Sequence, residues 1–465
     1  MFRAIMIAKG LSTTRFPLHI VTTTSPPYCG LCIANRALFF TFVLAMHISP
    51  FFVAAALAAC FHAIPLGAQQ RHTIAAGETL YGVARQHGIT TDALCAANAG
   101  LSAEHFAVGQ SVVIPVPKQT VTMAVALPFG VGDTRSQHVL EFYRGALMAA
   151  DDFRKGGTDV VVHGVEAGTT AADARFVMSR HPELAKADFV IAPQPDEQMD
   201  EWVAFSQKNG VMLVAPWWQR GAAKASHGGV WLTAVQHDDE MHDLASVIAT
   251  VLPRTNAVVV AHVAGEDSER TSRLTAVAQA LAPKGSKVHH LPDGASAEEA
   301  IAALTGTKGS AVVICTARGR DDVRRVTSLL QQVQAALPKC NISALGDSQW
   351  LEWSAELSRA YHALDTHVWG AALRSEGGRT IAFEGRYREW AGRSMSPLSP
   401  RWGTMGYDVA WHFLQMVGGA RADAHPMEHR MTMQRVGANG GWANKASMMM
   451  KHYKRDGGVE MIERK

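Results

Sequence analysis

The sequence predicts an α/β protein in which a small βααβ module precedes a two-lobed, doubly wound domain. Three observations lead to this fold class. Residues 72–115 read as strand, helix, helix and strand, within a span too short for an ordinary enzyme domain. From residue 121 onward, short apolar runs alternate with amphipathic stretches, which is typical of parallel strands joined by helices. These β/α units continue for longer than one compact sheet accommodates, so they predict two lobes.

The segment 1–68 is expected to direct export and not to belong to the fold. Residues 37–63 are almost entirely apolar, and small residues crowd their C-terminal end, which favours a cleaved signal peptide over a membrane helix. We expect cleavage after Ala68, with Met46 as a possible true start. A lipobox-like sequence ending at Cys60 offers the alternative of a lipid anchor. Both readings place the protein in the periplasm or cell envelope.

The boundaries of the small module can be read from single residues. Strand 72–74 leads into a turn, and helical periodicity begins at Leu80. Gly88 ends the first helix and Asn98 closes the second. The final strand, residues 111–114, is stopped by a proline.

This pattern resembles the LysM module, whose marks are a Gly-Asp/Glu-Thr-Leu turn, an asparagine after the second helix and a last strand ending in Ile-Pro. The chain carries these marks at Gly77, Glu78, Thr79, Leu80, Asn98 and Ile114. LysM modules bind polymers that contain N-acetylglucosamine. The resemblance therefore implies that residues 69–118 bind peptidoglycan or a chitin-like glycan.

The six marked residues are the predicted glycan contacts. The turn at Gly77 leaves backbone donors unobstructed for an acetamido group, while Leu80 and Ile114 are expected to add apolar surface. Taken singly, Gly77 and Asn98 are also what an ordinary turn and helix end require.

The first series of β/α units opens with the apolar run 121–127, which is typical of a strand buried on both faces. Predicted helices alternate with predicted strands: helices at 141–153, 171–179 and 197–208, strands at 159–165, 188–192 and 211–215. This order predicts a parallel sheet with right-handed crossovers.

A second series follows Trp217 and Trp218. It contains helices at 240–251, 268–281, 297–304 and 321–337, and strands at 257–263, 287–291, 311–315 and 342–345. The two series predict a domain over residues 119–425, with a ligand cleft between the C-terminal ends of its two sheets. Residues 426–465 are expected to pack back on this domain, with a strand at 433–436 and a hairpin around Asp-Gly-Gly at 456–458.

The domain resembles type 1 periplasmic binding proteins of the branched-chain amino acid receptor kind. The similarity rests on segments that match the family's first, third and fourth units and its return helices: 123–129, 142–146, 189–193, 211–216, 383–388 and 406–408. It extends from Val121 to about Gly418. The resemblance implies a two-lobed receptor fold that binds a ligand in its cleft.

One departure bears on the ligand. Amino-acid receptors of this family hold the charged groups of the ligand with Ser or Thr hydroxyls after the third and fourth strands, and this chain has none at either turn. A charged head group desolvated without partners is costly, so amino-acid binding is disfavoured. The predicted cleft residues are Phe129, Gln194, Trp217, Trp218, Tyr407 and Asp408. The tryptophans could instead plug the hinge between lobes, and Asp408 could cap a helix.

Composition and motifs exclude several classes. A dispersed net charge of +3 gives no nucleic-acid footprint. After export, Cys95, Cys315 and Cys340 remain, too few for a disulfide framework, and they are expected to be buried thiols. No metalloprotease, nucleophile-elbow or Walker motif is present, so the protein is predicted not to be an enzyme and to need no cofactor. The pair at 289–290 lacks a third ligand at suitable spacing, so no metal site is predicted.

The leading hypothesis is an exported, non-catalytic, cell-wall-associated binding protein. Its module would hold peptidoglycan, and its two-lobed domain would bind a small ligand or a cell-wall protein. One alternative is the solute-binding receptor of an ABC transporter for amino acids or peptides. Another is a protein activator of peptidoglycan synthases, in which the same fold acts by protein contact.

Overall fold

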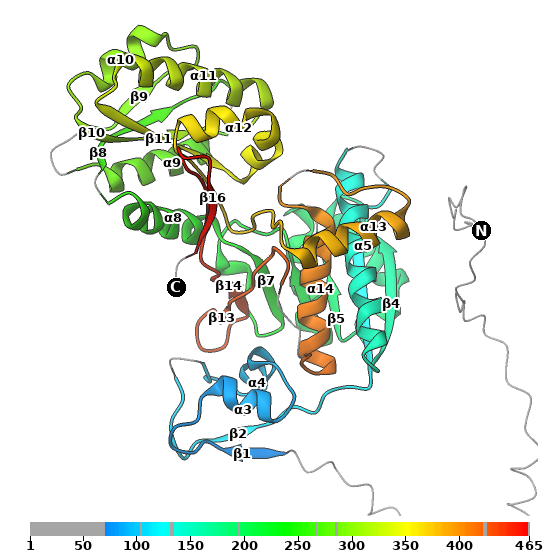
Figure 1. The fold of residues 1–465 in the computed structure, drawn as a ribbon. Helices are drawn as coiled ribbons and strands as arrows, with labels where there is room; N and C mark the ends of the chain where they lie inside the picture. Colours follow the sequence, from blue (N-terminus) through cyan, green and yellow to red (C-terminus); the bar gives the residue numbers. More distant parts are fainter. Residues whose placement is uncertain are drawn as a thin grey trace, which may run out of the picture. The chain divides into compact units, whose positions relative to one another are not determined.

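The computed structural model describes residues 70–102, 105–130, 134–193, 196–253, 255–265, 267–283, 287–397, 399–421 and 426–463 (Figure 1). Residues 69–465 form one compact unit. The predicted export signal, its cleavage site and Cys60 lie outside the described residues. Within the described ranges, no helix is both long and apolar enough to span a membrane.

The small module has the predicted βααβ order. Its elements are β1 (Arg71–Thr73), α3 (Leu80–Gln86), α4 (Thr91–Ala96) and β2 (Ser111–Val113). The two strands pair antiparallel, with Arg71 opposite Val113. Thr79 and Thr90 start the helices, because each hydroxyl accepts a backbone N–H three residues on, at 3.0 Å in both cases.

The first lobe is built on a seven-stranded sheet with the order β13-β14-β7-β6-β5-β3-β4. Its strands are β3 (Thr120–Leu127), β4 (Asp159–Glu166), β5 (Phe189–Ile191), β6 (Met212–Ala215), β7 (Val230–Val235), β13 (Met433–Arg435) and β14 (Trp442–Asn444). All neighbours are parallel except β13 and β14. The helices α6 (Ala171–Arg180) and α7 (Met199–Asn209) cover one face of this sheet.

The helices α5 (Thr134–Lys155) and α14 (Trp402–Gly418) cover the other face and lie side by side (Figure 1). Glycines allow their close approach. A Cβ at Gly145 would lie 1.9 Å from the carbonyl oxygen of Gly403, and one at Gly406 would lie 1.9 Å from that of Phe142. Any larger side chain at these positions would force the helices apart. The helix α13 (Gly378–Ala391) precedes α14.

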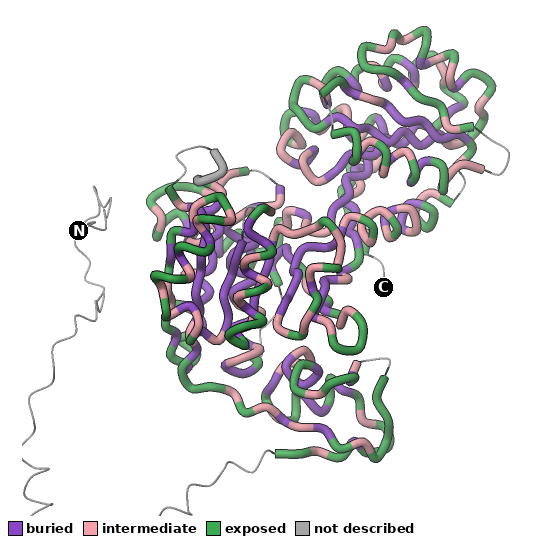
Figure 2. Tube along the Cα trace, turned by 180° about the vertical axis from the view of Figure 1, so that it is seen from behind, coloured by how far each residue is buried: buried purple, intermediate pink, exposed green. Residues whose placement is uncertain are grey.

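The second lobe repeats this plan with the strand order β16-β15-β12-β11-β10-β8-β9. Its strands are β8 (Thr255–Ala261), β9 (His289–Leu291), β10 (Gly309–Cys315), β11 (Cys340–Asp347), β12 (Thr366–Gly370), β15 (Met449–Tyr453) and β16 (Val459–Glu463). The helices are α8 (His237–Val251) and α9 (Ser268–Leu281) on one face, and α10 (Ala297–Leu304), α11 (Arg320–Ala336) and α12 (Ser354–Ala363) on the other. In both lobes the central strands are buried and lie between layers of helices that expose part of their surface (Figure 2).

The chain crosses between the lobes three times, after β7, after β12 and after β14. The C-terminal segment is more than a packed tail. Its strands β13 and β14 extend the first sheet, whereas β15 and β16 extend the second as an antiparallel hairpin. The hairpin around 456–458 is therefore confirmed.

The sequence missed β7, β12, β14 and α12, and it started α5 seven residues late. The buried β7 carries Thr233 inside its apolar run, and the first turn of α5 is polar (Thr-Arg-Ser-Gln), which hides both elements from a periodicity argument. The predicted two-lobed α/β fold with a βααβ module is confirmed.

Candidate functional site

Two loops of the βααβ module lie side by side and expose backbone. The Ile74 N–H donates to the Gln110 carbonyl at 3.0 Å, and the Gly109 N–H donates to the Ile74 carbonyl at 2.8 Å. Gly77 and Gly109 have φ values of +85° and +86°, and no atom lies within 4 Å of where a Cβ would stand. Both turns therefore need glycine for their backbone and leave open space beside it.

Glu78 and Thr79 hold the shape of the first loop. The Glu78 carboxylate accepts the Ala75 N–H at 2.8 Å and lies 2.8 Å from His72 Nε2. These contacts, the Ala75 N–H foremost, lower the pKa of Glu78. Thr79 caps α3 through the N–H of Gly82 at 3.0 Å. Their side chains are thus committed to the loop, while its backbone remains available.

The exposed apolar surface of the module is not where the sequence places it. Leu80 and Ile114 are buried in the core, so their side chains offer no contact surface. Tyr81, Phe106 and Val108 are instead 66%, 36% and 65% exposed. Tyr81 follows the loop at Gly77, and Phe106 and Val108 belong to the loop paired with it. The sequence did contain one indication of this surface, because Tyr81 is an aromatic residue that does not belong to the buried face of α3.

Asn98 ties the second helix to the last strand. Its side-chain amide donates to the carbonyls of Leu94 and Val113 and accepts the Val113 N–H, each at 2.8 Å. All three contacts are internal to the module.

In the first lobe, Trp217 and Trp218 project into different hydrophobic clusters on opposite faces of the sheet. The Trp217 ring packs on Phe142 and Trp402, with centroid distances of 4.6 and 5.8 Å. The Trp218 indole N–H donates to the Gly221 carbonyl at 2.9 Å. Both tryptophans are half-buried, and they do not form one site.

Phe129 and Tyr407 are also engaged in packing and hydrogen bonding. The Phe129 ring lies 4.9 Å from that of Tyr143. The Tyr407 hydroxyl donates to Asp152 at 3.0 Å, and burial raises the pKa of this tyrosine. Gln194 lies outside the described residues.

Asp408 lies in the middle of α14, so it is not the cap at the start of a helix that the sequence allows as an alternative. Its carboxylate accepts three consecutive backbone N–H groups, from Met427, Glu428 and His429, at 2.8 to 2.9 Å. Burial raises the pKa of Asp408 to about 7, against the lowering effect of these donors. Asp408 thereby anchors the chain that follows α14.

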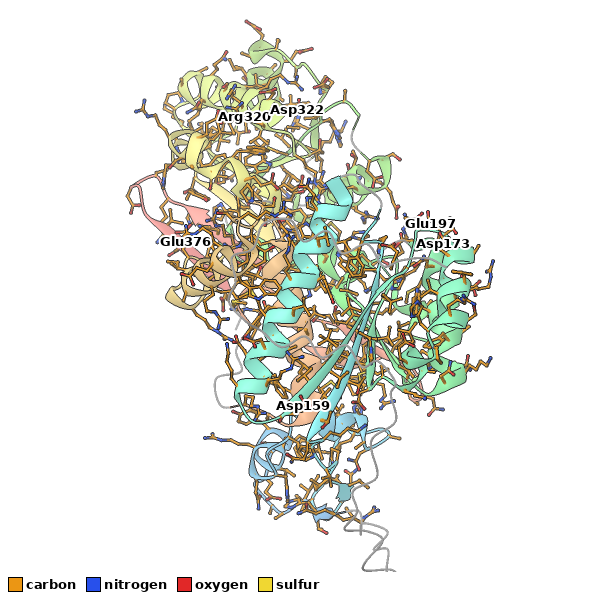
Figure 3. The ribbon with its side chains drawn as sticks, turned by 90° about the vertical axis from the view of Figure 1, so that its right-hand side faces the viewer. Asp159, Asp173, Glu197, Arg320, Asp322 and Glu376 are labelled. Carbon is orange, nitrogen blue, oxygen red and sulfur yellow. The ribbon has the colours of Figure 1, made fainter. Side chains whose placement is uncertain are left out.

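The C-terminal strand ends of the second lobe carry a buried ion network. Asp347, at the end of β11, is 3% exposed and accepts Arg270 at 2.8 Å and Arg318 at 2.6 Å. The two arginines lie 77 and 29 residues from Asp347 in the sequence, so spacing along the chain did not indicate this network. Figure 3 shows Arg320 and Asp322 near the start of α11 at the surface of this lobe.

The connection between α13 and α14, residues 392–397 and 399–401, contacts both lobes. The Ser396 N–H donates to Glu141 on α5 at 3.0 Å, and the Ser399 N–H donates to Glu352 at 3.2 Å, in the 3₁₀ turn after β11. Burial raises the pKa of both carboxyl groups. The chain's own backbone therefore occupies one oxygen of each of these two carboxylates.

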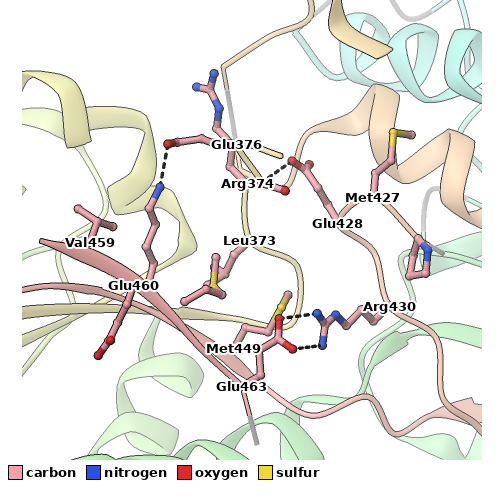
Figure 4. A pocket seen from close by; sticks show the side chains of 14 residues that line it. Leu373, Arg374, Glu376, Met427, Glu428, Arg430, Met449, Val459, Glu460 and Glu463 are labelled. Carbon is pink, nitrogen blue, oxygen red and sulfur yellow. Dashed lines mark hydrogen bonds and ion pairs between the residues drawn. The ribbon is translucent and has the colours of Figure 1, made fainter. Parts of the chain in front are cut away.

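A cavity of about 390 Å³ lies away from the tryptophans, among the segments that join the lobes (Figure 4). Its walls come from the connection after β12, the chain after α14, and the hairpin β15–β16. Half of the fourteen residues that line it are charged: Arg374, Glu376, Glu428, Arg430, Lys451, Glu460 and Glu463. Arg430 donates to Glu463 at 3.0 Å across it. The sequence did not predict this cavity, because its walls are distant in sequence.

Comparison with known proteins gives three results. The LysM domain family matches residues 72–115. A search of curated proteins found no match to the chain. Among solved structures, a branched-chain amino acid ABC transporter protein from Rhodospirillum rubrum covers 74% of this chain and all of its own length, at 13% identity and a TM-score of 0.54.

LpoA from Haemophilus influenzae is similar over 75% of this chain and 60% of its own length, at 12% identity and a TM-score of 0.50. At such identities the similarity shows the fold alone. The chain therefore contains a LysM domain at residues 72–115, and its two seven-stranded sheets form the two-lobed fold of the type 1 periplasmic binding proteins.

Proposed function

We propose that the protein is a non-catalytic, cell-wall-associated binding protein, exported to the periplasm or cell envelope. Its LysM domain attaches it to peptidoglycan or a chitin-like glycan, and its two-lobed domain binds a small ligand or a protein partner. The observation that carries the proposal is the exposed surface formed by the paired loops at residues 75–79 and 105–110.

The chemistry of this surface suits an N-acetylglucosamine polymer. Each acetamido group offers an N–H, a carbonyl and a methyl group. The open backbone at Gly77 and Gly109 supplies hydrogen-bonding groups, and Tyr81, Phe106 and Val108 supply apolar surface beside it. A binding site for a small carbohydrate combines an apolar floor with a few polar groups held in fixed positions.

Co-sedimentation of residues 69–465 with purified peptidoglycan tests the proposal. We expect the chain to pellet and Tyr81→Ala to weaken binding about tenfold, since an aromatic contact is worth about 1 kcal/mol beyond its buried area. The matched control is Phe176→Ala on α6, which removes an aromatic side chain that is 65% exposed. If the wild-type chain stays in the supernatant, or if both variants behave alike, the glycan surface is misplaced.

For the two-lobed domain, a protein partner is the candidate that one observation favours. The α13–α14 connection uses backbone N–H groups to occupy Glu141 and Glu352, one carboxylate from each lobe. A solute entering between them would have to displace this segment, whereas contact through an outer surface would not. Amino-acid reception stays the weaker alternative, because the described residues that follow β5 and β6, Pro193 and 216–218, include two tryptophans and no serine or threonine.

Native mass spectrometry of the freshly purified chain separates these candidates. We expect the mass of the polypeptide without a bound organic molecule. A stoichiometric organic ligand that survives purification would instead favour the solute receptor.

A further inference from the structure

Two histidines and an aspartate converge where the C-terminal hairpin joins the second sheet. On the paired strands β12 and β15, His367 lies opposite His452, and on β16 Glu460 lies opposite His452 in turn. Directly opposed residues of antiparallel strands share one face of the sheet. Asp365, two residues before His367, completes the cluster, and one ligand atom from each of Asp365, His367 and His452 lies within 4.8 Å of the others.

The three side chains already contact one another. His452 Nε2 lies 2.8 Å from a carboxylate oxygen of Asp365. The imidazole rings of His367 and His452 stack with a centroid distance of 3.9 Å and an interplanar angle of 14°. Asp365 has a φ of +48°, in the left-handed region that aspartate and asparagine tolerate better than most residues.

His367 is the member that points to a missing ligand. Its side chain is completely buried. The backbone of Asp365 lies beside the ring, and at least one ring nitrogen is left without a hydrogen-bond partner among the described atoms. A buried polar group left without a partner is destabilising and uncommon in folded proteins.

We propose that Asp365, His367 and His452 bind a divalent transition-metal ion, with zinc as the expected occupant. Two imidazoles and one carboxylate form a donor set that Zn²⁺ accepts, with a fourth position left for water. The Asp365 and His452 side chains are 25% and 15% exposed, so the site is open to solvent on their side. The sequence missed it because His452 and Asp365 are 87 residues apart.

Two neighbouring side chains contact the proposed ligands His452 and Asp365, as residues around a metal site contact its ligands. Glu460 lies 3.4 Å from Nδ1 of His452, the ring nitrogen that does not face Asp365. The Ser343 hydroxyl donates to the second carboxylate oxygen of Asp365 at 3.1 Å. Such contacts orient ligating histidines and carboxylates in metalloproteins.

The ion would join the hairpin β15–β16 to the sheet that the rest of the second lobe forms. Lys451 and Glu460 of this hairpin line the cavity between the connecting segments. Metal binding would therefore fix one wall of that cavity. The proposal stands independently of glycan binding by the LysM domain.

The test uses residues 69–465, stripped with a chelator and titrated with Zn²⁺ by calorimetry, with metal analysis after dialysis. We expect one zinc ion per chain and a higher melting temperature. Asp365→Asn suits the left-handed backbone but removes the charged ligand, and it should weaken zinc binding by tenfold or more. His452→Gln should have a similar effect.

His290→Gln is the matched control. His290 and His262 form a second stacked pair on the same sheet, with ring nitrogens 2.9 Å apart, but no third ligand joins them among the described residues. This variant should bind zinc as the wild type does. The proposal is overturned if the stripped chain takes up no zinc, if His290→Gln abolishes uptake, or if the folded Asp365→Asn and His452→Gln variants retain wild-type affinity.

Discussion

The residues at the C-terminal ends of the strands differ between the two lobes. They pack through aromatic rings in the first lobe and form a buried ion network in the second. In the first lobe, Trp217 packs against Phe142 and Trp402, with few directional contacts. In the second, Asp347 is buried between Arg270 and Arg318. Aromatic packing tolerates rearrangement at moderate cost, whereas a buried charge that loses a partner does not. The first lobe therefore offers an adaptable surface and the second a rigid one.

The C-terminal strands are shared by both lobes, so removing them should have the largest effect. Deleting residues 431–465 removes β13 and β14 from the first sheet and β15 and β16 from the second. We expect loss of a cooperative thermal transition and exposure of apolar surface, measured by calorimetry and by binding of a hydrophobic dye. A truncated chain with an unchanged melting temperature would show that the two sheets do not depend on these strands.

We expect the second largest loss of stability from a substitution in the buried ion network at the strand ends of the second lobe. Asp347→Ala removes a buried carboxylate that two arginines contact, and it should lower the free energy of unfolding by about 3 to 5 kcal/mol. Asp321→Ala on α11 removes a carboxylate that is 88% exposed and should cost less than about 0.5 kcal/mol. Chemical denaturation measures both. Equal losses in the two variants would contradict a special role for the buried network.

Substitutions of Trp217 and Trp218 test whether aromatic packing at the strand ends of the first lobe tolerates change at moderate cost in stability. Trp217→Ala should lower the free energy of unfolding by about 2 kcal/mol and Trp218→Ala by about 1 kcal/mol, because both side chains are only half-buried. Since they lie in different clusters, the losses should add in the double variant. A coupling of more than about 1 kcal/mol between them would mean that they share one site after all.

The pH dependence of stability gives the smallest expected effect. His367 in the second lobe and His429 beside the first sheet are buried, and burial lowers the pKa of each to about 4. Between pH 6.5 and 4 the unfolded chain binds more protons at these residues, so they lower stability as the pH falls through this window. The effect should be about 1 kcal/mol per histidine at pH 5.5.

Three carboxyl groups, two of them buried and Glu352 half-buried, act in the opposite direction. Desolvation raises the pKa values of Glu141, Glu352 and Asp408, so the folded chain binds more protons at these groups. The informative measurement is therefore a difference between variants of the metal-free chain. His429→Gln should make stability less dependent on pH between 4 and 6.5. An unchanged slope would mean that His429 is not held neutral.

Local signals explain how much of the fold could be predicted from sequence. The helices α9 and α10 have the predicted ends, 268–281 and 297–304, because Asp267 and Ser296 are strong N-caps. The Ser296 hydroxyl and the Glu299 carboxylate form a capping box that is readable in the sequence. β7 and β12 were missed, since short strands without clear periodicity depend on their neighbours for burial.

The candidate sites were less predictable, because they depend on pairing between distant segments. The turn at Gly77 was identified from its local chemistry, but the loop that carries Phe106 and Val108 is placed beside it only by backbone pairing with Ile74. The cluster of Asp365 and His452 forms only through the register of β12 and β15. Spacing along the chain carries no information about such contacts.

Hydrogen exchange of residues 69–465, measured with and without N-acetylglucosamine oligomers, shows whether the paired LysM loops bind glycan. We expect slower amide exchange in residues 75–81 and 105–110, since bound sugar would cover the open backbone there. We expect no change at the strand ends of either lobe or in the α13–α14 connection. Unchanged exchange in both LysM loops at saturating oligomer, or protection confined to the two-lobed domain, would contradict glycan binding by these loops.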